Sequence, residues 1–274
     1  MTHYENFPVA SWLCPPKLRA PIAAIYGFAR TADDIADEGQ APAPQRLDDL
    51  AAYRADLAAV AGAQTPSTRW PEVFAPLRAV IQEFKLPVPL LADLLSAFEQ
   101  DVTKSRDRAG YADRDELLDY CRRSANPVGR LLLHLYGVRD ASALVRSDRI
   151  CTALQLINFW QDLGLDIARG RFYLPHQDCA VHGVAQEDLL ALRQTPSVTK
   201  LIAFHVDLAR STMLKGSELV HQVPGRAGWE LRLVVQGGLR ILDKIEAMNF
   251  ATLHKRPKLS ARDAPAMLWR SLWM

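Results

Sequence analysis

A long proline-free stretch places the strongest constraint on the fold of this chain. No proline occurs between Pro127 and Pro175, and apolar residues recur at helical spacing over about Ser142–Ile167. Two further long helical runs cover about Val198–His221 and Gly228–Leu253. Sustained period-two alternation and Asn-Gly or Asp-Gly hairpin turns are absent from the sequence. The sequence therefore predicts an all-α fold.

Prolines and glycines divide the rest of the chain into shorter helical runs. We expect helices over Lys17–Asp37 and Leu47–Val60, and a break at Leu86–Pro89 before a run that reaches Asp101. The connecting segments are short and no repeat stands out. We therefore predict a single domain over residues 1–274, with eight to ten helices.

Composition excludes several classes of protein. The 274 residues carry 33 Lys and Arg against 31 Asp and Glu, and this net charge of +2 argues against a general nucleic-acid binder. The four cysteines form no CxxC pair, which disfavours a disulfide framework and a zinc site. No run of about 18 apolar residues and no secretory leader is apparent, so we expect a cytoplasmic protein.

The predicted helix at Lys17–Asp37 ends in acidic residues. Asp33 and Asp37 are four positions apart, so both carboxylates lie on one face of a helix, although like charges at this spacing repel. They also lie near the C-terminal end of the helix, where the macrodipole disfavours negative charge. One interpretation is a solvated acidic helix end. The apolar residues around the acids favour the other interpretation, the wall of a cavity.

A second polar stripe runs along the predicted helix at Ser142–Ile167. It advances by three or four residues at a time, through Gln155, Asn158, Asp162, Asp166 and Arg169. Its surroundings are apolar or aromatic, whereas the polar face of an amphipathic surface helix would normally be richer in Lys and Glu. We therefore expect the stripe to face inward, where amides and carboxylates need partners.

Two inward-facing aspartate pairs on different helices can hold the same divalent ions. Oxygen ligands favour Mg²⁺ over zinc or copper, and Mg²⁺ typically completes its coordination with water and substrate phosphates. We expect the metal ligands to be Asp33, Asp34, Asp37, Asn158, Asp162 and Asp166. Donors to the oxygens of a diphosphate would come from Arg30, Arg169, Arg171 and Tyr173.

Several further motifs accompany the aspartates. They are Ala24–Arg30, Gln100–Val102, Tyr120–Cys121, Val128–Gly129 and Arg171–Pro175. Together with the aspartates, these motifs make nearly the whole chain resemble the squalene/phytoene synthase family. The resemblance implies an isoprenoid-synthase-type helical bundle with a central cavity, and catalysis with Mg²⁺.

Within that family, three segments are most similar to the hydroxysqualene synthases of hopanoid biosynthesis: Glu5–Ser11, Tyr120–Gly129 and Asn158–Asp162. Ser124-Ala125-Asn126 stands where squalene and phytoene synthases carry Val-Ala-Gly. The resemblance implies a carbon–oxygen lyase that converts presqualene diphosphate to hydroxysqualene without nicotinamide reduction. The alternatives are a presqualene diphosphate, squalene or phytoene synthase, which are prenyltransferases, and a non-catalytic assembly factor.

The resemblance also implies roles for individual residues. Mg²⁺ held by the four paired aspartates would neutralise the departing diphosphate. The residues expected to bind substrate are Tyr26, Phe28, Arg30, Tyr120, Gln155, Asn158 and Arg171, and Tyr173 would donate a hydrogen bond. The aromatic residues Tyr26, Phe28, Phe159 and Trp160 are candidates to stabilise the carbocation, with core packing as the alternative.

Asn126 is a candidate to position the water molecule that captures the carbocation, together with Ser124. It is polar at a position where squalene and phytoene synthases carry glycine. The alternative is a helix N-cap, because Asn126 directly precedes Pro127 and Asn-Pro often begins a helix.

The C-terminal segment allows two interpretations. His254–Lys258 and Arg262 supply basic residues, and Trp269 and Trp273 would share one face of a helix. Basic residues beside an amphipathic aromatic segment are typical of a peripheral contact with a lipid surface. A tail helix packed on the bundle is the alternative.

Overall fold

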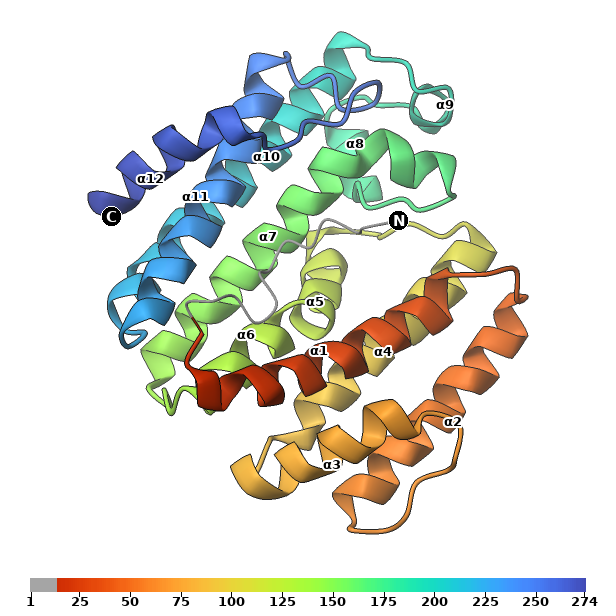
Figure 1. Ribbon diagram of the computed structural model, residues 1–274. Helices are drawn as coiled ribbons and strands as arrows, with labels where there is room; N and C mark the ends of the chain where they lie inside the picture. The colour runs from red at the N-terminus through yellow and green to blue at the C-terminus, as the bar shows by residue number, and fades with distance from the viewer. Residues whose placement is uncertain (1–13) are drawn as a thin grey trace.

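The computed structural model describes residues 14–274, and these residues form α-helices and two 3₁₀-helices but no strands (Figure 1). The α-helices are α1 (Pro16–Asp37), α2 (Ala43–Ala61), α3 (Pro71–Phe84), α4 (Val88–Asp107), α5 (Arg114–Ser124), α6 (Asn126–Leu135), α7 (Ala141–Ala168), α8 (His176–Val181), α9 (Gln186–Leu190), α10 (Pro196–Gly216), α11 (Arg226–Ala247) and α12 (Ala264–Leu272). The 3₁₀-helices are η1 (Ser217–His221) and η2 (Ala261–Asp263). The all-α prediction is confirmed. The twelve α-helices in the described range exceed the expected eight to ten, partly because α8 and α9 are too short to show a periodicity.

The longest helix, α7, forms where the proline-free stretch predicts it. The Asp140 side chain caps its first turn by accepting a hydrogen bond from the amide of Ala143. The helix then runs for 28 residues to Ala168, and Gly170 leaves it with a φ of +79°. This single rigid element carries the whole expected polar stripe except Arg169, which is the C-cap residue.

The prediction for the last long helix is wrong at its C-terminal end. The apolar periodicity continues to Leu253, but α11 ends at Ala247. Asn249 and Phe250 have φ values of 52° and 59°, so they lie in the left-handed region and turn the chain out of the helix. The segment that follows α11 is therefore a loop that crosses back over α7.

The core is divided into two hydrophobic clusters. One cluster joins α1, α2, α3 and α4 with part of α6, and contains Phe28, Tyr53 and Phe74. The other is built mainly by α5, α7, α10 and α11. In Figure 1, α7 lies between the helices α1–α4 and the helices α10–α12. The two helices with aspartate pairs, α1 and α7, thus belong to different clusters.

The state of the cysteines and the character of the helices bear on cross-linking and on membrane insertion. Cys14, Cys121, Cys151 and Cys179 are all buried as free thiols. Among the helices of residues 14–274, none has the length and apolar character needed to cross a membrane.

Candidate active site

The C-terminal end of α1 forms an acidic cluster around one arginine. Arg30 contacts Asp33 at 3.3 Å and Asp34 at 2.6 Å, and it also reaches Glu38. Burial and the nearby Asp37 charge raise the pKa of Asp33 to about 6. The interpretation of this helix end as a cavity wall is supported, because Arg30 and Asp33 both line the large cavity described below.

The C-terminal end of α7 carries the second aspartate pair. Asp166 is only 8% exposed, and burial together with the Asp162 charge raises its pKa to about 7. Leu165, between them in sequence, points outward and is 50% exposed. The polar stripe therefore faces inward as predicted, except at Arg169, which is exposed.

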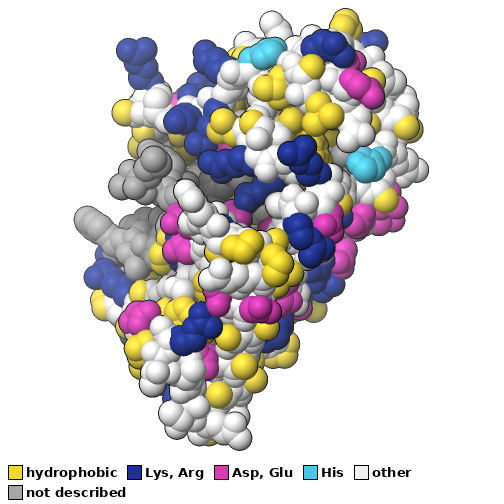
Figure 2. All heavy atoms as spheres, turned by 90° about the vertical axis from the view of Figure 1, so that its right-hand side faces the viewer, with side chains coloured by type: hydrophobic (Ala, Val, Ile, Leu, Met, Phe, Trp, Pro, Cys, Tyr) yellow, Lys and Arg dark blue, Asp and Glu magenta, His cyan; other side chains and the backbone are white. Residues whose placement is uncertain are grey.

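Arg171 connects the two helices. Its guanidinium donates a hydrogen bond to Asp37, and this carboxylate raises the pKa of Arg171 above its ordinary value although burial opposes the charge. The negative charge of Asp37 also contributes to the raised pKa of Asp166 on α7. The two aspartate pairs are thus close enough to interact electrostatically, with Arg171 between them. On the face of the molecule shown in Figure 2, basic and acidic side chains adjoin one another around a hollow.

The predicted metal ligands are not gathered into one preformed site among the described residues. Within residues 14–274, no three His, Cys, Asp or Glu side chains lie close enough together to hold a metal ion. Instead, arginines contact carboxylates of both pairs, and burial and mutual repulsion raise the pKa values of Asp33 and Asp166. Carboxylates that repel one another in a partly buried site favour Mg²⁺, with which the arginines would compete.

Arg256 is a site residue that the sequence interpretation missed. It binds Asp162 through two hydrogen bonds, one of them 2.9 Å from Nη2 to Oδ2. Arg256 lies in the loop after α11, 94 positions away in sequence. Neither interpretation of the C-terminal segment predicts a contact between this loop and an aspartate.

A glycine in α7 allows this loop to approach the site. A Cβ atom on Gly164 would lie 2.2 Å from the carbonyl oxygen of Leu253, so only glycine fits there. The amide of Gly164 donates to the carbonyl of Thr252 at 3.3 Å. A glycine midway between Asp162 and Asp166 is the sequence signal that could have indicated a crossing chain.

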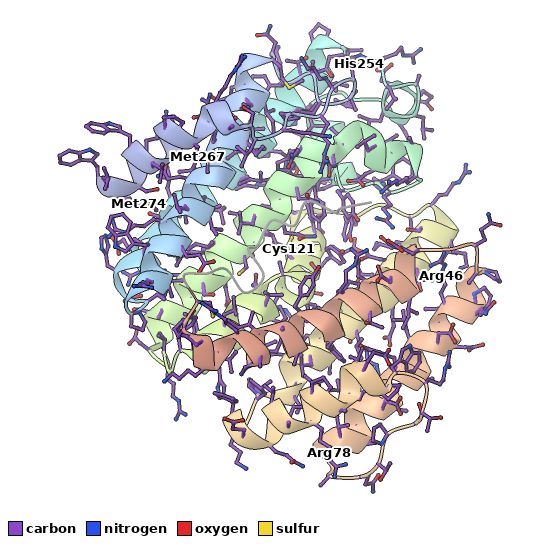
Figure 3. All side chains as sticks on the ribbon, viewed as in Figure 1. Arg46, Arg78, Cys121, His254, Met267 and Met274 are labelled. Atoms are coloured by element: carbon purple, nitrogen blue, oxygen red, sulfur yellow. The ribbon has the colours of Figure 1, made fainter. Side chains whose placement is uncertain are left out.

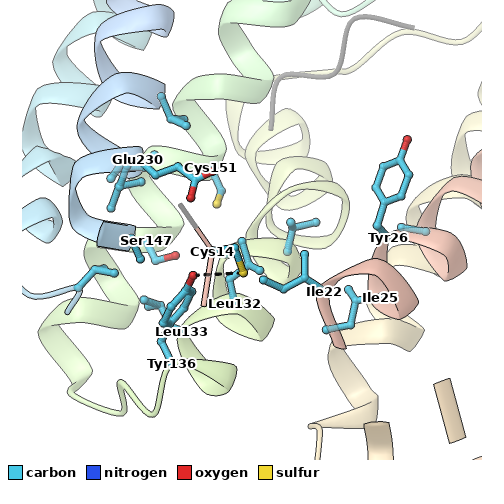
Figure 4. Close-up of a pocket in the computed structure, with 18 of the residues that line it drawn as sticks. Cys14, Ile22, Ile25, Tyr26, Leu132, Leu133, Tyr136, Ser147, Cys151 and Glu230 are labelled. Carbon is cyan, nitrogen blue, oxygen red and sulfur yellow. Dashed lines mark hydrogen bonds between the residues drawn. The ribbon is translucent and has the colours of Figure 1, made fainter. Parts of the chain in front are cut away.

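An apolar cavity of about 390 Å³ extends from the acidic end of α1 into the bundle. Helices α1, α6, α7 and α11 supply most of its lining. Figure 4 shows Tyr26, Ile22 and Ile25 on the α1 side of this cavity. The expected role of Tyr26 beside a bound hydrocarbon chain is therefore compatible with its position.

Stacked aromatic side chains lie next to the aspartates. The rings of Tyr173 and Phe159 are stacked with centroids 3.8 Å apart. The Tyr120 hydroxyl donates to Asp101 at 2.6 Å, and burial raises the pKa of Asp101 to about 7. The charges of Asp101, Asp166 and Arg171 all influence the pKa of Tyr173, so the ring stack lies close to the charged groups of α7 and the segment that follows it.

Two of the aromatic candidates lie elsewhere. Phe28 is fully buried on the other side of α1, where its ring stacks on Tyr53 at 5.1 Å. Trp160 is fully buried against His205 on α10. Neither lines the cavity, and both side chains are fully buried, so the structure favours the core-packing alternative for Phe28 and Trp160.

Asn126 is buried and is not a helix cap. It is the first residue of α6, Ala125 occupies the N-cap position, and no side chain caps this helix. The Asn126 Oδ1 atom accepts a hydrogen bond of 2.9 Å from Thr152 on α7, three positions before Gln155. The nearby Ser124 hydroxyl is buried without a hydrogen-bond partner among the described residues. The N-cap alternative is therefore wrong.

The remaining predicted residues, Gln155 and Asn158, lie half-buried on α7, on the same stripe as Asp162.

A sequence model of the family described as squalene/phytoene synthase matches residues 1–263. The chain belongs to the squalene/phytoene synthase family. Members of this family are enzymes that process prenyl diphosphates and generally depend on divalent metal ions.

Individual members of the squalene/phytoene synthase family are similar over most of the chain. A hydroxysqualene synthase of Sinorhizobium fredii is 34% identical over 249 residues, which cover 90% of this chain and 80% of that protein. A hydroxysqualene synthase of Rhodopseudomonas palustris is 34% identical over 247 residues, covering 89% and 80%. The crystal structure of squalene synthase HpnC from Alicyclobacillus acidocaldarius has a TM-score of 0.81, 35% identity and 90% coverage of both chains. The isoprenoid-synthase-type helical fold is thereby confirmed.

Proposed function

We propose that this chain converts presqualene diphosphate to hydroxysqualene in a Mg²⁺-dependent reaction of squalene and hopanoid biosynthesis. The observation that carries this proposal is an apolar cavity with Arg30 and Asp33 in its lining, beside a second aspartate pair on α7. Arg171 binds Asp37, and both groups influence the pKa of Asp166 on α7. The 34% identity to two hydroxysqualene synthases supports the choice of reaction.

The proposed reaction begins with loss of diphosphate. Asp33, Asp37, Asp162 and Asp166 would hold Mg²⁺, with Asp34 and Asn158 as further ligands, and the metal would supply charge neutralisation for the leaving group. Arg30, Arg171 and Arg256, which bind carboxylates in the structure, would then donate to diphosphate oxygens. The carbocation that remains would lie near the Tyr173–Phe159 stack, rearrange, and be captured by water.

Incubation with presqualene diphosphate, Mg²⁺ and ¹⁸O-labelled water tests this function. We expect hydroxysqualene that carries one ¹⁸O atom, detected by mass spectrometry, because water supplies the hydroxyl oxygen. Squalene, unlabelled alcohol or unchanged substrate would contradict the proposal.

A prenyltransferase is the second candidate function. A phytoene synthase of Thermus thermophilus is 29% identical over 267 residues, covering 97% of this chain and 87% of that protein. Such an enzyme would join two prenyl diphosphates at the same site. Incubation with farnesyl or geranylgeranyl diphosphate and Mg²⁺ distinguishes this candidate, because only a prenyltransferase would form presqualene diphosphate, squalene or phytoene. A non-catalytic assembly factor is disfavoured because all four paired aspartates are retained.

Asn126 is proposed to position the capturing water, together with Ser124. Its buried amide and the unpartnered Ser124 hydroxyl supply the hydrogen-bonding groups that an ordered water needs. We expect Asn126→Ala to lower the ratio of alcohol to hydrocarbon products by about tenfold, since one positioned hydrogen bond is worth about 1–1.5 kcal/mol. The ratio is measured by gas chromatography. Thr152→Val serves as a control that removes the partner of Asn126 but keeps its amide; an unchanged ratio in Asn126→Ala would exclude the role.

The exposed face of α12 is proposed as a peripheral contact with an anionic lipid surface. Trp269 and Trp273 are 63% and 77% exposed, and Leu268 and Leu272 are also exposed. Exposed basic residues precede α12 in the sequence at Lys255, Lys258 and Arg262. The opposite side of α12 packs on α11, and Arg232 binds the Ser271 carbonyl there. The two interpretations of this segment are therefore compatible. Figure 3 labels Met267 on this helix and Met274 just beyond its C-terminal end.

Replacement of both exposed tryptophans tests the lipid contact without removing the helix. We expect Trp269→Ser/Trp273→Ser to bind vesicles of anionic phospholipid at least about tenfold more weakly in co-sedimentation, because two large apolar side chains no longer enter the interface. Leu190→Ser, an exposed leucine on α9, is the matched control and should bind as the unchanged protein does. Equal binding by the tryptophan variant would exclude this surface.

A further inference from the structure

The apolar cavity changes character at the end away from the aspartates. Most of its lining is hydrocarbon, but Tyr136, Ser147, Cys151 and Glu230 gather where α6, α7 and α11 meet. Figure 4 shows these four side chains at one end of the cavity, opposite Tyr26. The Tyr136 hydroxyl contacts the Cys14 sulfur at 3.9 Å. A hydrocarbon chain that enters from the aspartates therefore meets polar groups at the far end.

Helix α7 sets the distance between the two ends. Ser147 and Asp162 lie on this one unbroken helix, 15 positions apart, which is about 22 Å along the axis at 1.5 Å per residue. On α1, Arg30 and Asp33 lie near the C-terminal end, and Ile22 lines the cavity about two turns earlier. Both helices thus run along the cavity toward their acidic C-terminal ends, α7 from Ser147 and α1 from Ile22. A bound prenyl diphosphate would lie along them with its tail toward Glu230.

Glu230 is an unusual side chain for this position. It is half-buried, it lines the cavity, and it makes no hydrogen bond or ion pair with any residue of 14–274. Its charge adds to burial and to the Cys14 sulfur in raising the pKa of Tyr136, which places the two groups within electrostatic reach. A carboxylate without a protein partner depends on water, and covering it with hydrocarbon is strongly unfavourable.

We propose that Glu230 limits the length of the prenyl chain that the cavity accepts. Tyr136 and Ser147 extend the polar end that it forms. A farnesyl-length chain would end before the carboxylate, whereas a geranylgeranyl chain, longer by one isoprene unit, would displace the water on which Glu230 depends. This limit presupposes the prenyl diphosphate chemistry proposed above. It would make Glu230 a specificity-determining residue for the length of the substrate chain.

Binding of unreactive analogues tests the chain-length limit independently of turnover. Farnesyl thiodiphosphate and geranylgeranyl thiodiphosphate are titrated in the presence of Mg²⁺ by isothermal calorimetry. We expect the unchanged protein to bind the farnesyl analogue at least about tenfold more tightly. In Glu230→Met, which replaces the carboxylate by an apolar side chain of similar length, we expect this preference to fall by about tenfold or more. Glu230→Gln should keep most of it, because a buried amide also needs hydrogen bonds.

Two further variants make the test decisive. Glu230→Leu repeats the measurement with a second apolar side chain, so the result does not depend on the folding of one variant. Glu83→Leu, on the exposed face of α3, is the matched control and should leave the preference unchanged. If both apolar variants bind the farnesyl analogue normally and still prefer it to the geranylgeranyl analogue as strongly as the unchanged protein does, the chain-length limit is overturned. That outcome leaves the proposed function unaffected. Failure of the unchanged protein to bind either analogue also overturns the chain-length limit, whereas the proposed function is tested separately by turnover of presqualene diphosphate.

Discussion

Replacement of Asp37 by asparagine is expected to lower kcat with presqualene diphosphate by about a thousandfold, because in the proposed reaction charge stabilisation of the leaving group would be the main catalytic contribution. Asparagine keeps the size of the side chain but removes the charge that Arg171 and Mg²⁺ would share. The measurement is kcat at saturating Mg²⁺, with product quantified by mass spectrometry.

The matched control for Asp37→Asn is Asp48→Asn on α2. Asp48 is exposed and, unlike Asp37, forms no ion pair with Arg171, so the same chemical change there should leave kcat unaffected. Circular dichroism should show the same helical content in both variants, because neither change alters the apolar core. A kcat of Asp37→Asn equal to that of the control would remove Asp37 from the catalytic site.

Replacement of Arg256 by glutamine is expected to change both catalysis and metal dependence. Arg256 and Asp162 are 31% and 15% exposed, so their ion pair lies between a surface pair and a buried pair. Its loss should lower the stability of the metal-free protein by about 1–2 kcal/mol, because Asp162 is left to repel Asp166. Mg²⁺ should restore most of this loss. We also expect kcat/KM to fall by about a hundredfold, since one donor to the diphosphate is missing.

Thermal unfolding with and without Mg²⁺ measures the metal dependence of Arg256→Gln. We expect a larger Mg²⁺-induced rise in melting temperature than in the unchanged protein. Arg262→Gln changes an exposed arginine in the same C-terminal region and is the control, for which the rise should be normal. An equal rise in Arg256→Gln and in the control would show that Arg256 does not compete with the metal for Asp162.

The parts of the site that local spacing determines could be predicted from the sequence. On a helix, residues four apart share a face, so the spacing of Asp162 and Asp166 within a long helical run is enough to predict that both face inward. The same rule predicts that Tyr26 and Phe28 lie on different faces of α1. Residues two apart on a helix point in nearly opposite directions, and the structure places Tyr26 in the cavity and Phe28 in the core.

Other parts depend on contacts that no local pattern encodes. Arg256 reaches Asp162 across 94 positions, through a loop whose path depends on Gly164 and on the left-handed residues after α11. The Asn-Pro sequence at Asn126 is a common start signal, but α5 and α6 are separated by Ala125 alone. The side chain of Asn126 is therefore enclosed by α7 rather than free to cap a helix.

The division of the core into two clusters has a consequence for the motions of the protein. Asp33 and Asp37 lie on a helix that packs in the cluster of α1–α4, whereas Asp162 and Asp166 lie on a helix that packs in the cluster of α7, α10 and α11. In the structure, the Arg171–Asp37 ion pair links residues on the two sides. A ligand that binds both aspartate pairs would connect the two clusters and stabilise them relative to each other. Amide hydrogen exchange should therefore slow in the helices of both clusters when the site is filled.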